Sequence, residues 1–255
     1  MEPDSVVVTL GDDRVARIEL NRPAVANSFD LGVARELAAT IRRISLDDQI
    51  AAVLVTGRGP RFCAGGDLGS MMGAPDPQEF VEELALVLDD ALQQLAALGL
   101  PVVAAVHGAV AGAGLALMLS CDLVVAAEST RFVSAYLGVG LTPDCGLSYL
   151  LPRAVGQQRA LELALTRRSL TAAEAQQWGM VSEVVPDGAV HERGLELARQ
   201  LTTESGMAVA AAKRLMRDTW TRTRGETGAV EAKTIAEALD TDTARALIVR
   251  RLGQS

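Results

Sequence analysis

The order of apolar and polar positions predicts strands alternating with helices in the first half of the chain. Residues 6–10 and 15–20 alternate in the manner of strands and flank a Gly-Asp-Asp turn, which predicts a hairpin. Apolar side chains then recur at helical spacing over 31–41. A short apolar run at 51–56, followed by a glycine, predicts a buried strand.

The middle of the chain repeats this alternation. A loop with glycines and prolines precedes a long helical pattern from Gln78 to about Leu98. Apolar runs at 102–106 and 123–126 predict two further buried strands, joined by a glycine-rich turn and a helical segment. Units of this kind predict an α/β fold.

Beyond about Asp144 the pattern becomes helical. Thr171 is expected to cap a helix that ends at Trp178, with Gly179 just beyond its end. The chain shows no internal repeat and no low-complexity linker. We therefore expect an α/β core over residues 1–195 and a helical C-terminal part over residues 196–255.

Composition and charge narrow the classes of partner. Hydrophobic residues make up 49% and charged residues 22%, as in ordinary soluble globular proteins, and aromatics are only 3%, so the core is expected to consist of Ala, Leu and Val. The formal net charge of -8 argues against nucleic acid or an anionic membrane as the main partner, because both require a basic face. A local basic patch for a phosphorylated cofactor remains compatible with this charge.

The cysteines and the terminal segment bear on compartment. Cys63, Cys121 and Cys145 are an odd number without paired spacing, which predicts free thiols in a reducing cytoplasm rather than disulfides or a zinc site. Residues 1–5 are acidic and lack a signal-peptide pattern. The apolar stretch over 102–127 is interrupted by a histidine, glycines and an aspartate, which argues against a transmembrane helix.

Two segments of small residues follow predicted buried strands, at 61–68 and 107–117. Small residues let a ligand approach the main chain, whose N–H groups can then donate hydrogen bonds. The second segment opens a helix, and a helix N-terminus favours an anion. It lacks the spacing of a P-loop or a dinucleotide fingerprint. A tight strand-to-helix connection is the simpler explanation of either segment taken alone.

Together with their neighbours, these segments resemble the crotonase (enoyl-CoA hydratase/isomerase) family over roughly residues 5 to 252. The matching motifs, in the order of that family, are Asn21-Arg22-Pro23 with Asn27, Phe62-Cys63-Ala64-Gly65-Gly66-Asp67-Leu68, Pro101 to Gly108, Cys121-Asp122, Thr171 to Ala175, and Trp178 to Val181.

The resemblance implies a spiral of ββα units with a helical C-terminal part that builds a homotrimer or a dimer of trimers. It implies an acyl-CoA substrate, of which coenzyme A is a part, and no prosthetic group. By motif position the main-chain N–H groups of Gly66 and Ala113 would form an oxyanion hole for the thioester oxygen. The residues implied to line the CoA channel are Ala24, Val25, Ala26, Gly66, Asp67 and Leu68.

The family's hydratases use two glutamates as acid and base, and this sequence has neither of them. The glutamate expected three residues after the second oxyanion donor is Ala116, and the glutamate expected after Phe132 is Tyr136. Alanine transfers no proton, and a tyrosine with an unperturbed pKa of about 10 is a poor base at neutral pH. Efficient hydration by two carboxylates is therefore not expected.

One acid stands at a suggestive position, Asp144. The stretch Pro-Asp-Cys-Gly around it resembles the family's ring-epoxide and enoyl-CoA isomerases, in which a single aspartate acts as acid and base. A single carboxylate suits isomerisation, since it can take a proton from the α-carbon and return it at the γ-carbon. The alternative is structural, because Pro-Asp before a helix is a common N-cap arrangement.

Other candidates have simpler structural explanations. His107 is expected to make a structural hydrogen bond, and His191 to lie on the surface. Asp67 and Asp122 are expected to make structural hydrogen bonds. A solvated helix face is the simpler role for Glu82 and Glu83, and a nucleophilic thiol at Cys63 or Cys145 would need a base that the sequence does not supply.

The leading hypothesis is an enoyl-CoA isomerase that uses Asp144, with the N–H groups of Gly66 and Ala113 holding the enolate. An atypical hydratase is the second hypothesis, and a non-catalytic acyl-CoA binder is the third. Resemblance of fold cannot choose among the three.

Overall fold

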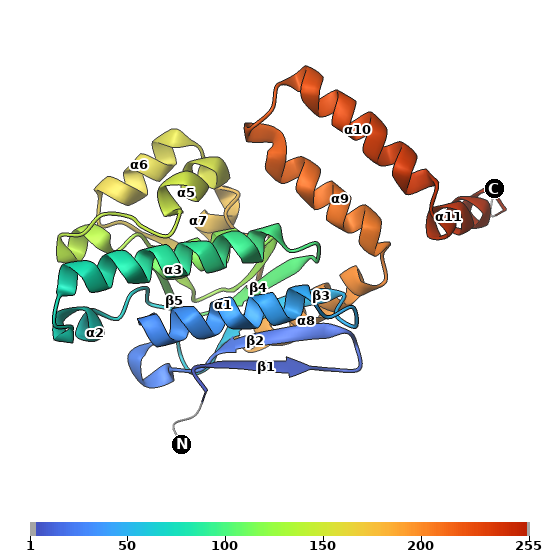
Figure 1. Ribbon diagram of the computed structural model, residues 1–255. Helices are drawn as coiled ribbons and strands as arrows, with labels where there is room; N and C mark the ends of the chain where they lie inside the picture. The colour runs from blue at the N-terminus through green and yellow to red at the C-terminus, as the bar shows by residue number, and fades with distance from the viewer. Residues whose placement is uncertain (1–3, 254–255) are drawn as a thin grey trace.

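A larger sheet forms the centre of the molecule, which we describe from a computed structural model covering residues 4–253 (Figure 1). Its six strands have the order β1-β2-β3-β4-β6-β9, and all neighbours run parallel except the hairpin of β1 and β2. These strands are β1 (Val6–Leu10), β2 (Val15–Leu20), β3 (Ala52–Gly57), β4 (Val102–Val106), β6 (Leu123–Ala127) and β9 (Glu183–Val185).

A smaller sheet of three short strands stands beside it, in the order β5-β7-β8. The strands are β5 (Ala109–Ala111), β7 (Arg131–Val133) and β8 (Ser169–Thr171). The chain passes from β4 to β5 and again from β6 to β7, and each pair of strands is followed by helices. This repeated passage is the expected spiral of ββα units.

Helices surround both sheets. They are α1 (Leu31–Ser45), α2 (Leu68–Gly73), α3 (Pro77–Ala97), α4 (Ala113–Ser120), α5 (Leu147–Val155), α6 (Gln157–Leu165), α7 (Ala172–Gln177), α8 (Val190–Thr202), α9 (Gly206–Arg217), α10 (Arg224–Leu239) and α11 (Asp242–Leu252). Single 3-10 turns are η1 (Pro23–Val25), η2 (Tyr136–Val139), η3 (Asp187–Ala189) and η4 (Asp218–Trp220).

Both faces of the larger sheet are buried, which explains why its strands read as continuous apolar runs. Successive side chains of a strand point to opposite faces. Val53 and Val55 belong to the core that includes α1 and α3, whereas Ala52 and Leu54 belong to the core covered by α8. The helix α8 lies close to β4, because a Cβ placed on Gly194 would be only 2.8 Å from the Cβ of Ala105.

The strands and helices predicted from the sequence up to 127 are confirmed to within a few residues. The predicted N-cap is confirmed as well, since Thr171 and Glu174 form a reciprocal capping box. Gly179 follows the end of that helix with φ of 83°. Sequence reasoning missed α2 and the four three-residue strands β5, β7, β8 and β9.

The C-terminal helices α9, α10 and α11 extend away from the sheets as an arm (Figure 1). The division expected after residue 195 falls inside α8, which packs on the larger sheet, so the arm begins only beyond Thr202. Asp122 ties α9 to the core through Lys213 at 2.8 Å and Arg217 at 2.7 Å. The expected structural role of Asp122 is consistent with these contacts.

Within residues 4–253, no helix combines the length and the apolar character needed to cross a bilayer. Residues 1–3 of the N-terminal segment considered for a signal pattern lie outside the described part of the chain.

Candidate functional site

The two loops of small residues lie side by side. Cys63 and Val110 form an isolated parallel bridge, in which the N–H of Ala111 donates to the carbonyl of Cys63 at 3.0 Å. The N–H of Cys63 donates in turn to the carbonyl of Ala109 at 3.3 Å. Segments about fifty residues apart in sequence are thus joined by main-chain hydrogen bonds.

Glycines allow this close approach. A Cβ placed on Gly114 would lie 2.5 Å from the carbonyl oxygen of Cys63, nearer than a side chain tolerates. Gly65 has φ of 100°, and a Cβ there would lie 3.3 Å from the amide nitrogen of Ala113. Glycine is required at these positions for two physical reasons, contact with backbone and left-handed geometry.

The amides of Gly66 and Ala113 take no part in the hydrogen bonds that hold the loops together. Phe29 pairs with Gly66 through the N–H of Asp67 and the carbonyl of Gly65, both at 2.8 Å, so the Gly66 amide faces the other side. Ala113 is the first residue of α4, where helical N–H groups lack intrahelical partners. Among residues 4–253 neither amide has a protein acceptor. Both amides are therefore free to donate a hydrogen bond to a ligand.

The segments expected to line a CoA channel flank these donors. The N–H of Ala64 donates to the carbonyl of Ala26 at 3.0 Å, which holds η1 against the first loop. Val25 is 42% exposed and Leu68 47% exposed, so apolar side chains on both segments face solvent. Asp67 caps α2 and pairs with Arg22 at 3.2 Å, in agreement with its expected structural role.

At the positions of the two hydratase acids the structure has a buried alanine and a buried tyrosine. Ala116 is fully buried in α4. The phenol of Tyr136 donates a hydrogen bond of 2.6 Å to Oδ1 of Asp144. The ring of Tyr136 borders the second loop, since a Cβ placed on Gly112 would lie 3.8 Å from Cζ. Asp144 is therefore connected to the second loop of small residues through Tyr136.

The capping alternative for Asp144 is wrong. Helix α5 begins at Leu147, its N-cap is Gly146 with φ of 74°, and no side chain caps it. Since Asp144 does not hold the helix end, its carboxylate is available for another role. A second carboxylate, that of Asp89 on α3, approaches the loop of Asp144 that precedes α5, because its Oδ1 would lie 3.1 Å from a Cβ on Gly146.

The remaining candidates take structural positions. Nε2 of His107 donates to the carbonyl of Gly59 at 2.8 Å, as expected for a structural histidine. His191 is exposed, with its ring edge-on to that of His107 at 5.0 Å. Glu82 and Glu83 are exposed on α3, and Glu83 pairs with Arg35. These two acids lie on a solvated helix face.

The cysteines of the site are buried and protonated at neutral pH. Burial raises the pKa of the Cys63 thiol to about 12. Burial is also the main cause that raises the pKa of Cys145, with the carboxylate of Asp144 as the next cause. A thiol nucleophile requires a lowered pKa, so neither residue is suited to that role.

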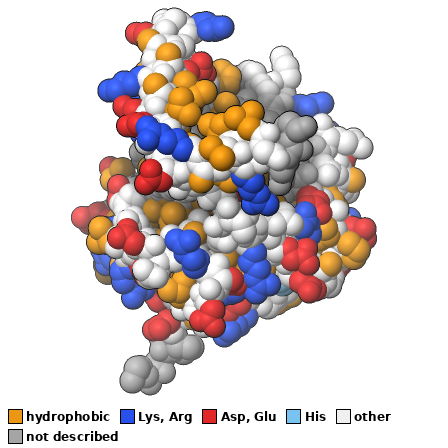
Figure 2. All heavy atoms as spheres, turned by 90° about the vertical axis from the view of Figure 1, so that its right-hand side faces the viewer, with side chains coloured by type: hydrophobic (Ala, Val, Ile, Leu, Met, Phe, Trp, Pro, Cys, Tyr) orange, Lys and Arg blue, Asp and Glu red, His pale blue; other side chains and the backbone are white. Residues whose placement is uncertain are grey.

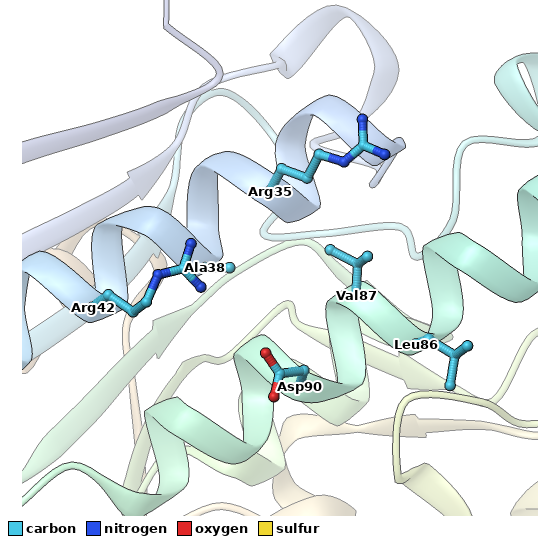
Figure 3. A pocket seen from close by; sticks show the side chains of 6 residues that line it. All are labelled: Arg35, Ala38, Arg42, Leu86, Val87 and Asp90. Carbon is cyan, nitrogen blue, oxygen red and sulfur yellow. The ribbon is translucent and has the colours of Figure 1, made fainter.

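Two features of the site were not predicted from the sequence, the bond between Tyr136 and Asp144 and the approach of Asp89. Tyr136 was noted only as a missing acid. A surface hollow between α1 and α3 is a separate feature: it has a volume of about 360 Å³ and is lined by Arg35, Arg42 and Asp90 among others (Figure 3). In residues 4–253 no group of three or more His, Cys, Asp or Glu side chains could hold a metal ion.

Comparison with known proteins places these loops in a family. The family model described as enoyl-CoA hydratase/isomerase matches residues 11–249. The 1,2-epoxyphenylacetyl-CoA isomerase of Escherichia coli K12 is 39% identical over 214 residues, covering 82% of this chain and 80% of that protein. The 4-chlorobenzoyl coenzyme A dehalogenase-2 of an Arthrobacter species is 37% identical over 191 residues, covering 74% and 69%.

Solved structures agree with this result. The enoyl-CoA hydratase of Mycobacterium smegmatis superposes with a TM-score of 0.93 and 27% identity, over 99% of this chain and 97% of that chain. The proteins that this chain resembles thus carry the names of an isomerase, a dehalogenase and a hydratase. The chain belongs to the enoyl-CoA hydratase/isomerase family of acyl-CoA enzymes, also called the crotonase family.

Proposed function

We propose that the protein shifts a double bond within an enoyl-CoA thioester. One observation carries the proposal: Asp144 is the acid that remains where the hydratases have two others. Ala116 and Tyr136 occupy the positions of the two hydratase acids, and the carboxylate of Asp144 is hydrogen-bonded to Tyr136. The E. coli relative, at 39% identity, is named an isomerase of an acyl-CoA, which supports an isomerisation as the reaction class.

In the proposed reaction the thioester oxygen binds between the N–H groups of Gly66 and Ala113. Asp144 takes a proton from the α-carbon, and the electron pair of that C–H bond moves into a conjugated enolate. The two amides stabilise the negative oxygen, each by on the order of 10²–10³ in rate by analogy with other oxyanion holes. Asp144 then returns the proton at the γ-carbon, and the double bond becomes conjugated with the carbonyl. No water is consumed.

The coenzyme A part of the substrate is proposed to lie along the segments that flank the donors. Main chain at Ala24, Val25 and Ala26 would form one wall, and Gly66, Asp67 and Leu68 the other. This placement is supported by the hydrogen bond that joins the two segments and by their exposed apolar side chains.

The proposal is tested with a panel of 3-enoyl-CoA thioesters of several chain lengths and one aryl-substituted member. Double-bond migration and water addition are followed separately by chromatography of the thioesters. We expect migration with at least one member and much slower hydration of crotonyl-CoA. Faster hydration than migration would favour an atypical hydratase, and binding without turnover would favour a non-catalytic acyl-CoA binder.

We further propose that the C-terminal arm assembles the protein into a homotrimer or a dimer of trimers. Hydrophobic side chains gather over the C-terminal helices in Figure 2, and Ile235 and Val249 are 71% and 69% exposed. Apolar surface of this kind marks an interface, and a second copy of the chain offers the same surface to it.

Charged substitutions on the arm are expected to reduce the size of the assembly. Ile235→Glu combined with Val249→Glu would place two carboxylates in the interface, where desolvation disfavours them. Sedimentation velocity at micromolar concentration should show a trimer or hexamer for the native protein and smaller species for the double variant. Leu46→Glu, at a residue that is 85% exposed beyond the end of α1, is the matched control and should not change the assembly. A native monomer would contradict the proposal.

A further inference from the structure

Tyr136 and Asp144 form a side-chain pair beside the oxyanion loops. The hydrogen bond from Oη of Tyr136 to Oδ1 of Asp144 measures 2.6 Å, short enough to be a strong bond to a charged acceptor. Tyr136 is only 8% exposed, and its ring faces the position of Gly112 at the start of α4. The pair thus ties the carboxylate to the loop that carries the Ala113 amide.

The backbone beside both residues is held in a sparsely populated conformation. Ala135, just before Tyr136, has φ of 68°, and Cys145, just after Asp144, has φ of 50°. Residues with a side chain pay an energetic penalty in this left-handed region, and such residues cluster at functional sites. The surrounding fold therefore holds Ala135 and Cys145 in a backbone conformation that they would not adopt by themselves, and this conformation fixes the geometry of the pair.

The phenol of Tyr136 can donate throughout a reaction at neutral pH. Burial raises the pKa of Tyr136 far above its usual value, and the neighbouring charge of Asp144 raises it further. Tyr136 is therefore not a base. It is a fixed hydrogen-bond donor whose proton stays on the phenol.

We propose that Tyr136 is a positioning residue, which holds Oδ1 of Asp144 so that Oδ2 is the atom that takes and returns the proton. This inference rests on the isomerase function proposed above and assigns a role to a residue at which the hydratases' acid is missing. The C–H proton passes from the α-carbon to Oδ2 and from Oδ2 to the γ-carbon. The Tyr136 proton does not enter the balance, and the electron pair stays within the dienolate.

The titratable groups around Asp144 bear on whether another side chain could replace Tyr136 as the donor. The other titratable groups that face this loop are the thiols of Cys145 and Cys63 and the carboxylate of Asp89 on α3. Both thiols are protonated at neutral pH, and a carboxylate cannot replace Tyr136 as a donor while it is charged.

Tyr136→Phe tests the inference, because it keeps the ring beside Gly112 and removes only the hydroxyl. We expect kcat for double-bond migration to fall about tenfold with KM changed by less than about twofold, since the bond orients the base and does not touch the substrate.

The other tyrosine supplies the matched control and a second variant. Tyr149 on α5 is 49% exposed and stacks with Arg153, and Tyr149→Phe should leave kcat and KM unchanged. The sequence has two tyrosines. In the Tyr149→Phe background, 3-fluorotyrosine therefore labels only Tyr136, and its altered hydrogen bond to Asp144 should change kcat while KM changes by less than about twofold. This measurement remains informative if Tyr136→Phe folds poorly.

Asp144→Asn in the same assay separates the two proposals. If the native protein shifts no double bond, or Asp144→Asn is as active as the native protein, the proposed function fails and this inference with it. If Asp144→Asn is inactive while Tyr136→Phe, or the fluorinated protein, keeps the native kcat, only the positioning role of Tyr136 is overturned.

Discussion

Asp144→Asn is expected to lower kcat for double-bond migration by at least the roughly 10²–10⁴ typical of general acid–base catalysis. Asparagine is nearly isosteric with aspartate and can still accept the hydrogen bond of Tyr136, but it cannot take a proton. Asp144 does not cap α5, so the thermal midpoint of unfolding should change little. Turnover of 3-enoyl-CoA and thermal unfolding monitored by circular dichroism provide the two measurements.

Asp89→Asn is the matched control for this substitution. Asp89 lies near the same loop, and its Oδ2 already accepts a hydrogen bond of 2.7 Å from Gln93. Removing its charge alters the local field without removing the proposed proton carrier, so we expect less than about a tenfold change in kcat, well below the loss from a missing acid or base. Unchanged turnover in Asp144→Asn, or equal losses in both variants, would exclude Asp144 as the unique acid and base.

Gly114→Ala is expected to lower kcat by about 10²–10³, as when one oxyanion donor is removed. The added methyl group would lie 2.5 Å from the carbonyl oxygen of Cys63 and 2.9 Å from its Cβ. The loop must move to relieve this contact, which separates the Gly66 amide from the Ala113 amide. Crowding of this kind also destabilises the fold by about 1–3 kcal/mol.

The loss of activity must be separated from the loss of stability. Turnover is therefore measured at a temperature where urea titration shows the variant to be folded. Gly225→Ala is the control, because a Cβ at Gly225 in α10 meets nothing within 4 Å. That variant should be fully active and slightly more stable, as expected for Gly→Ala in a helix. A folded Gly114→Ala protein with native turnover would contradict the proposed oxyanion hole.

The sequence predicted those parts of the fold whose pattern extends over a full element. Helix α3 and strand β3 have enough consecutive positions to establish a period, and both were found. The strands β5, β7, β8 and β9 have three residues each, which is too short for a period to appear. Helix α2 lies in a segment rich in glycine, whose low helix propensity favoured a loop.

The candidate site was predicted at the level of motifs and not at the level of side-chain contacts. Gly66, Ala113 and Asp144 follow from motif order, and the structure joins their segments. The hydrogen bond from Tyr136 to Asp144 lies between two residues with left-handed backbone, Ala135 and Cys145. Alanine and cysteine rarely adopt this conformation, so the sequence does not predict it. The capping alternative for Asp144 failed because the N-cap is the left-handed Gly146, two residues further on.

A crystal structure with a bound, non-reactive acyl-CoA tests the central claim most directly. That claim is that the amides of Gly66 and Ala113 and the carboxylate of Asp144 contact the same substrate molecule. We predict a thioester oxygen about 2.7–3.1 Å from the amide nitrogens of both Gly66 and Ala113, the distances required of an oxyanion hole. Oδ2 of Asp144 should face the α- and γ-carbons within a few ångströms. A thioester oxygen bound elsewhere, or a carboxylate of Asp144 turned away from both carbons, would contradict the account.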